Sequence, residues 1–175
     1  MEHYNGIMKM YVVNYLCIYY NFEECCHGKE EKSSSIEQQM AEQVIFQKVN
    51  DWLGVELVEN AKIFVGNTFM QPDFYSKADG IIGEIFAHIG KPKKAQDNKI
   101  SNDILKMLLL EKIEGKIYRK IIVVCDEDEM KKLKGTSVLA ECIRQFDIEV
   151  KMIEIETDLR DTLIEAQKRQ RMVNA

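Results

Sequence analysis

Two acidic residues eleven positions apart, Asp73 and Glu84, are the residues of this 175-residue chain whose types and spacing best suit chemistry. Asp79-Gly80, which lies between them, is a preferred pair for tight turns and predicts a β-hairpin. With these two residues as the loop, Tyr75 would lie opposite Glu84. Because side chains alternate along a strand, both acids would project from one face as diagonal neighbours, roughly 7–8 Å apart at Cα.

This carboxylate pair predicts a metal site. Two such charges repel unless a cation lies between them, and Mg²⁺ is commonly held by one or two carboxylates together with water and a substrate phosphate. Four lysines that suit a polyanion follow the second strand: Lys91, Lys93, Lys94 and Lys99. Such groups are what metal-assisted hydrolysis of a phosphodiester needs. We therefore expect Mg²⁺ (or Mn²⁺) as the cofactor and nucleic acid as the partner.

The acids also carry a family resemblance. Pro72-Asp73, then ten residues, then Glu84 resembles the PD-(D/E)XK signature of restriction-endonuclease-like nucleases. The resemblance implies that Asp73 and Glu84 hold the metal, together with the backbone carbonyl of Ile85. In that family, a lysine two residues after the glutamate helps to activate the attacking water, and here Phe86 stands at that position. The resemblance covers roughly residues 35 to 157.

The absent lysine has candidates further along the chain. Some members of the family supply it from the following helix, which makes Lys99 the candidate here, with Lys91 and Lys106 behind it. Gln96 would assist, as polar residues of that helix do in some relatives. Lys99 and Lys106 are seven residues apart and share a helix face. The alternative is therefore a solvated face of ion pairs that also includes Asp103.

Two further residues are candidates because of where they fall in the expected elements. Glu42 lies beside an apolar stripe of a helix that should begin at Ser34 or Ser35 and end near Trp52, and a carboxylate there is costly without a partner. In the resembled fold a first-helix Glu often points to the metal, so Glu42 is a candidate third carboxylate; otherwise it reaches water at the edge of the stripe. His88 falls on the face of the acid pair by alternation, where it either contacts substrate or lies at the rim.

The order of elements predicts the fold class. Apolar periodicity indicates short strands at 55–58 and 61–65, the hairpin, a helix that Gly115 ends, and a buried strand at 116–125. A helix at 138–146, a strand at 148–155 and a last helix from Asp158 to about Arg171 follow. This order predicts an α/β sandwich with a central mixed β-sheet flanked by helices. It is also the order expected of the restriction-endonuclease-like core.

Composition limits the partners and the compartment. The net charge of −5 means that any contact with nucleic acid must come from local basic patches. The five cysteines lack zinc spacing and indicate reduced thiols, so we expect a cytoplasmic protein. We expect residues 1–32 to form an apolar and tyrosine-rich appendage, followed at 33–175 by the domain that the resemblance implies is a nuclease. The apolar run is too short and too polar for a stable membrane anchor, and it would pack on the core or on a second subunit in a homodimer.

Other sites compete with the acid pair. The acidic run from Asp126 to Glu129 follows a buried strand, where open α/β sheets commonly bind ligands, and Asp126 with Asp128 would hold Mg²⁺ in a DxD manner. The alternative is a solvated loop. Lys168, Arg169 and Arg171 either touch a phosphate backbone or form a charged tail helix. The sequence has no Walker A motif, no GxGxxG motif and no nucleophile elbow.

Three functions remain open at this level. The first is a Mg²⁺-dependent nuclease that acts on DNA. The second is a catalytically inactive module of the same fold, which binds nucleic acid or a protein partner because Phe86 replaces the lysine. The third is a structural or regulatory subunit that dimerises through residues 1–32.

Overall fold

The computed structural model describes residues 36–91 and 94–173. All of them belong to the compact unit Ser34–Ala175. The appendage at 1–32, the expected helix cap at Ser34 or Ser35, and Lys93 lie outside the described residues.

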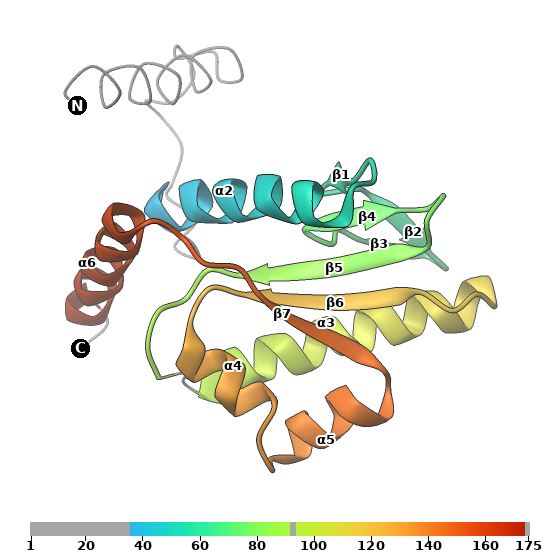
Figure 1. Cartoon of the computed structure of the whole chain (residues 1–175). Helices are drawn as coiled ribbons and strands as arrows, with labels where there is room; N and C mark the ends of the chain where they lie inside the picture. Colours follow the sequence, from blue (N-terminus) through green and yellow to red (C-terminus); the bar gives the residue numbers. More distant parts are fainter. Residues whose placement is uncertain (1–35, 92–93, 174–175) are drawn as a thin grey trace. The chain divides into compact units, whose positions relative to one another are not determined.

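A five-stranded mixed sheet forms the centre of the fold, in the order β1-β4-β5-β6-β7 (Figure 1). Strands β1 (Val58–Glu59), β4 (Phe74–Ser76) and β5 (Ile81–Phe86) pair antiparallel, whereas β5, β6 (Arg119–Val124) and β7 (Ile148–Met152) run parallel. Every residue of β5 is buried, which agrees with its largely apolar sequence. The α/β class with a mixed sheet and flanking helices is thus confirmed.

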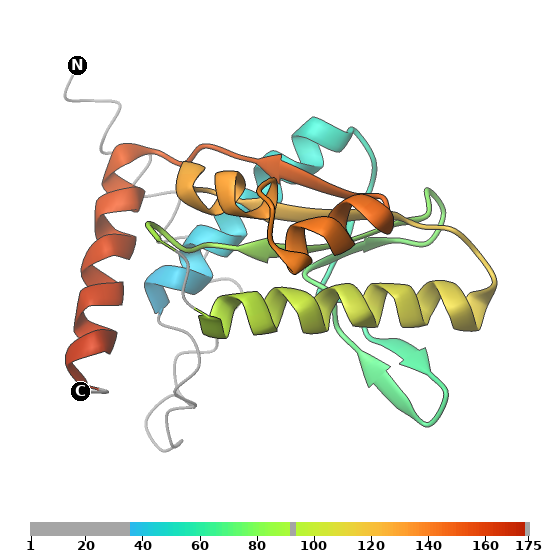
Figure 2. The same cartoon turned by 90° about the horizontal axis from the view of Figure 1, so that it is seen from below.

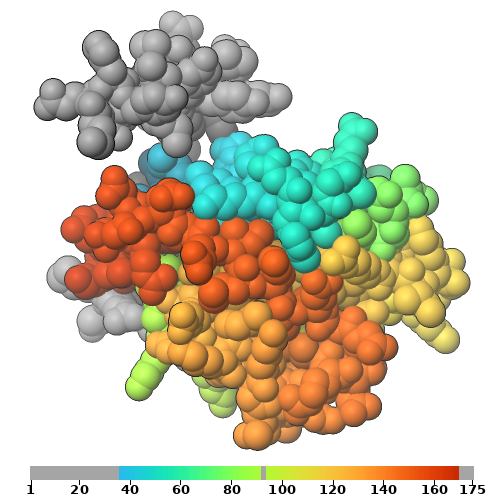
Figure 3. Space-filling view, viewed as in Figure 1, coloured from blue at the N-terminus to red at the C-terminus, as the bar shows by residue number. Residues whose placement is uncertain are grey.

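Helices cover both faces of this sheet. On one face, α2 (Ile36–Leu53) packs on the sheet and α6 (Thr157–Val173) packs against α2. On the other face lie α3 (Lys94–Glu114), α4 (Glu127–Leu133) and α5 (Val138–Gln145) (Figures 1 and 2). In the space-filling view, α2, β7 and α6 form much of the surface on one side of the molecule, and β5 contributes little to it (Figure 3).

The register of the central hairpin differs from the prediction by two residues. Phe74 pairs with Gly83 and Tyr75 with Ile82, so that Tyr75 does not lie opposite Glu84. The turn comprises four residues, 77–80, because Ser76 and Asp79 bond to each other across it: Ser76 Oγ donates to Asp79 Oδ2 at 2.6 Å. A shift of two residues keeps each side chain on its face of the sheet.

A close contact fixes this register. An added Cβ on Gly83 would lie 2.0 Å from Cζ of Phe74 and 2.7 Å from the carbonyl oxygen of Ile121. The Phe74 ring therefore occupies the space that any side chain at residue 83 would need. Continued by one residue, the observed register sets Asp73 across from Glu84.

Two elements were not foreseen. The segment 61–71 forms a separate two-stranded hairpin, β2 (Ile63–Val65) and β3 (Thr68–Met70), where only a short strand at 61–65 was expected. The acidic run is not a loop: Asp126 caps helix α4, and its side chain accepts the N–H of Asp128. None of the described helices has the length and apolar composition needed to cross a membrane.

Candidate metal and phosphate site

Asp73 and Glu84 lie together on the α3 side of the sheet. Asp73 ends the segment that leads into β4, and Glu84 is the fourth residue of β5. Asp73 Oδ2 accepts the backbone N–H of Ile85 at 2.6 Å, and the two acidic side chains are hydrogen-bonded to each other. The geometry expected from the sequence, two acids on one face at close range, is therefore present. Ile85, expected to offer its carbonyl, uses its N–H to orient Asp73.

Burial makes the ionised form of this pair unfavourable. Only 6% of Glu84 is exposed, and this burial, with the negative charges of Asp73 and Asp103, raises the pKa of Glu84 to about 9. Burial also raises the pKa of Asp73, although the N–H of Ile85 and the charge of Lys99 act in the opposite direction. With a pKa of about 9, Glu84 keeps its proton at neutral pH. A bound cation would replace that proton and let both groups ionise.

Helix α3 brings a carboxylate, Asp103, and an ammonium group, Lys106, to this pair. Asp103 is 2% exposed, and its Oδ1 accepts from Lys106 Nζ at 2.6 Å, while its Oδ2 is buried without a hydrogen-bond partner. Lys106 interacts electrostatically with Glu84 and Asp73 as well. Its own burial opposes the charge, but Asp103 and the acid pair raise its pKa overall, so Lys106 stays protonated. The alternative interpretation, a solvated face of ion pairs, was therefore wrong for Asp103.

Lys99 lies next to the residue that replaces the motif lysine. Its Nζ is 5.0 Å from the centroid of the Phe86 ring, close enough for a cation–π contact. The Lys99 charge lowers the pKa of both Asp73 and Glu42. An ammonium group therefore lies beside residue 86 even though that residue is phenylalanine. Lys99 is exposed, which leaves it accessible to a ligand.

Two more carboxylates interact with Asp73. Glu42, on α2, accepts from Gln38 Nε2 at 3.0 Å; burial and the negative charge of Asp73 raise its pKa. Glu59, at the end of β1, has a pKa raised by burial and by Asp73 in the same way. Sequence reasoning had proposed Glu42 but missed Glu59. Glu59 lies near Asp73 because β1 is an edge strand paired with β4. Nothing in the sequence indicated that pairing.

A small pocket lies beside Phe86 and Lys99. Its volume is about 190 Å³, and it includes Phe86, Lys99 and two of the predicted substrate residues, His88 and Gln96. Helix α6 closes one side, where the Gln167 amide pairs with both backbone groups of Ile89 at 3.0 Å. Of the other lysines proposed to bind substrate, Lys91 and Lys94 are exposed and do not line the pocket.

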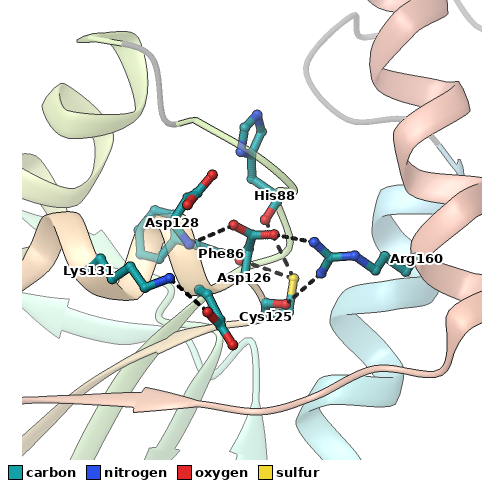
Figure 4. A network of polar contacts seen from close by, with 8 residues as sticks. Phe86, His88, Cys125, Asp126, Asp128, Lys131 and Arg160 are labelled. Carbon is teal, nitrogen blue, oxygen red and sulfur yellow. Dashed lines mark hydrogen bonds and ion pairs between the residues drawn. The ribbon is translucent and has the colours of Figure 1, made fainter.

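In the competing acidic run, 126–129, Asp126 makes structural contacts that occupy its carboxylate. The carboxylate of Asp126 forms an ion pair with Arg160 at 2.5 Å and caps α4, and these partners lower its pKa although burial opposes them (Figure 4). Figure 4 shows the Cys125 thiol directed at the backbone carbonyls of Phe86 and His88, with the His88 imidazole pointing away from Asp126. A hollow of about 390 Å³ lies at this edge, lined by Asp128, Glu154 and Arg160 among others. With its oxygens so engaged, Asp126 is a poor DxD ligand.

The donor set fits Mg²⁺ better than zinc. Within residues 36–91 and 94–173, no three His, Cys, Asp or Glu side chains are grouped to hold a metal ion by themselves. Zinc requires three or four protein ligands, whereas Mg²⁺ is satisfied by one or two carboxylates with water and phosphate.

Comparison of the chain with models of protein families, with curated proteins and with solved structures found no match.

Proposed function

We propose that this protein is a Mg²⁺-dependent nuclease of the restriction-endonuclease-like class that hydrolyses phosphodiester bonds in DNA. One observation carries the proposal: Glu84, which is buried, and Asp73, which is partly buried, form a carboxylate pair beside the ammonium groups of Lys99 and Lys106. Burying two acids is costly unless a cation or a proton compensates, and functional sites concentrate groups perturbed in this way.

Each residue has a role that follows from its surroundings. Asp73 and Glu84 would hold the cation, with Asp73 oriented by the Ile85 N–H. When bound, Mg²⁺ would supply a water of lowered pKa and neutralise charge on the scissile phosphate. Glu42 and Glu59 are close enough to influence Asp73 electrostatically and would accept hydrogen bonds from metal-bound or bulk water at the rim of the site.

The two lysines would perform different tasks. Lys106 has a raised pKa and is bonded to Asp103, so it cannot serve as a base and instead stabilises negative charge near Glu84. Lys99 is exposed and lies over Phe86, where it can meet the phosphate or orient the attacking water. The motif lysine is thus proposed to be replaced by a helix-borne one. His88 and Gln96, with Lys99, line the pocket in which substrate atoms next to the scissile bond would lie.

The test is cleavage of plasmid and linear DNA by the full chain in Mg²⁺ or Mn²⁺. We expect cleavage by wild type and its loss in Asp73→Asn and in Glu84→Gln, with the fold retained. The matched control is Glu127→Gln, because that carboxylate is exposed and belongs to the competing acidic run. Cleavage that survives both site variants would refute the assignment.

The second candidate is a binding module without catalysis, which the presence of Phe86 at the lysine position favours. Calorimetric titration with Mg²⁺ and Mn²⁺ separates the two. Metal binding that disappears in Glu84→Gln favours the nuclease. DNA binding with no metal binding at millimolar concentrations favours the module.

A further inference from the structure

The β2–β3 hairpin carries two phenylalanines in water. Phe64 and Phe69 face each other directly across the hairpin, with ring centroids 6.4 Å apart and planes at 62°. Phe64 is 73% exposed and Phe69 is 47% exposed. In Figure 2 the hairpin projects past α3, outside the five-stranded sheet. An exposed aromatic pair on a projecting element commonly marks a contact surface.

The hairpin presents these rings on a fixed base. Strand alternation turns Val65 and Met70 to the opposite side, where both are buried against Met107 and Leu110 of α3. Gly66, with φ of 59°, supplies the left-handed conformation that its tight turn requires. Because the inner side chains anchor the hairpin, the outer rings lose little further freedom when they bind a ligand.

A cation lies among the rings. Lys62 Nζ is 4.1 Å from the Phe69 centroid and 5.6 Å from the Phe64 centroid. A lysine in the middle of an apolar contact between two protein copies would be desolvated without an anionic partner, and lysine is depleted from such interfaces. Aromatic faces together with a cation suit nucleic acid, whose bases stack on rings and whose phosphates take the charge.

The hairpin is also close to the acid pair. Phe69 precedes Asp73 by four residues, so their Cα atoms are at most about 14 Å apart. Met107, on which the hairpin rests, is the residue next to Lys106. Since stacked bases in duplex DNA are separated by about 3.4 Å per strand, a strand held at Asp73 and Glu84 would pass the rings within about four nucleotides.

We propose that Phe64 and Phe69 form a stacking platform for unpaired bases of the nucleic-acid strand that enters the site, with Lys62 contacting its backbone. This inference rests on the proposed function and narrows its substrate class to DNA that is single-stranded or locally unpaired next to the scissile phosphate. Base pairs in an intact duplex offer no free base faces along the strand, so duplex binding would not use the rings.

Fluorescence anisotropy of labelled single-stranded and duplex oligonucleotides tests the platform. The full chain is measured in EDTA, so that no cleavage occurs. We expect Phe64→Ala combined with Phe69→Ala to weaken single-strand binding about 5- to 100-fold, with a much smaller effect on duplex. Phe64→Trp should retain affinity because it still stacks, whereas Phe64→Leu should not, although leucine is equally apolar.

Phe146→Ala is the matched control, because Phe146 is 45% exposed but belongs to the end of α5. Its single-strand affinity should equal that of wild type. If the double alanine variant bound the single strand as tightly as wild type does, the platform alone would be overturned. A lower mass in solution for the double alanine variant, with unchanged DNA affinity, would also overturn it, because the rings would then join two copies. Absence of any nucleic-acid binding by wild type would overturn both the platform and the nuclease.

Discussion

Replacing Glu84 by Gln should stabilise the metal-free protein at neutral pH while it abolishes cleavage. The glutamine has the same shape, and its amide can donate to Asp73 as the protonated acid does. It differs in that it cannot ionise. The wild-type side chain is buried, and its pKa rises from 4.5 to about 9 on folding.

The size of the effect follows from proton linkage. Between pH 4.5 and about 9 the folded protein holds a proton at Glu84 that the unfolded chain has released. The free energy of unfolding therefore falls as pH rises, by about 1.4 kcal/mol per pH unit. At pH 7 the loss from this group is about 3 kcal/mol relative to pH 4.5. Glu84→Gln does not have this loss, because glutamine does not ionise. For a chain of this length, the gain in free energy of unfolding corresponds to a melting temperature roughly 5–15 °C higher.

The assay is urea unfolding between pH 5 and pH 9 in EDTA, followed by the fluorescence of Trp52. We expect the wild-type curve to slope downward and the Glu84→Gln curve to be flatter and higher above pH 6. Mg²⁺ should then raise the free energy of unfolding of the wild type but not that of Glu84→Gln, by about 2.7 kcal/mol when its concentration is one hundred times its dissociation constant. If the variant were less stable than wild type at pH 8 and its free energy of unfolding changed with pH as steeply as that of wild type, the pKa of Glu84 would not be raised by folding.

Three other changes test the remaining parts of the site. Lys99→Met should lower kcat at least about 100-fold with unaltered unfolding, because Lys99 is exposed; equal kcat in steady-state assays would remove Lys99 from the site. Asp103→Asn should leave Lys106 loosely held and lower kcat more than it raises KM, and Asp103→Glu should restore part of the rate. Gly83→Ala should destabilise the fold by about 1–3 kcal/mol or more in urea titration, because its Cβ would collide with the ring of Phe74.

The sequence predicted the mixed sheet and the proximity of the acids because both depend on local patterns. Apolar alternation and turn residues are enough to assign β5 and β6, and parity alone puts Asp73 and Glu84 on one face. The exact pairing was wrong because the bonds between Ser76 and Asp79 close a longer turn than Asp-Gly usually forms.

The burial of Asp103 was not predicted, for a different reason. Its burial depends on how α3 is rotated over the sheet, and the exposed stripe of Leu105 and Leu109 on the opposite side of that helix makes sequence periodicity ambiguous. Charged residues at helical spacing normally face solvent, so a buried acid among them had no distinguishing signal. The same limit applies to the Phe64–Phe69 pair, whose outward orientation is set by the anchoring of the hairpin on α3.

The mounting of the basic groups on one helix has a mechanical consequence. Lys99, Asp103 and Lys106 all belong to α3, while the acid pair belongs to the sheet. A sliding or rolling of α3 over the sheet would therefore change the separation of both ammonium groups from the carboxylates in a single concerted step. The relative position of one helix and one sheet therefore sets the distance from both ammonium groups to the acid pair.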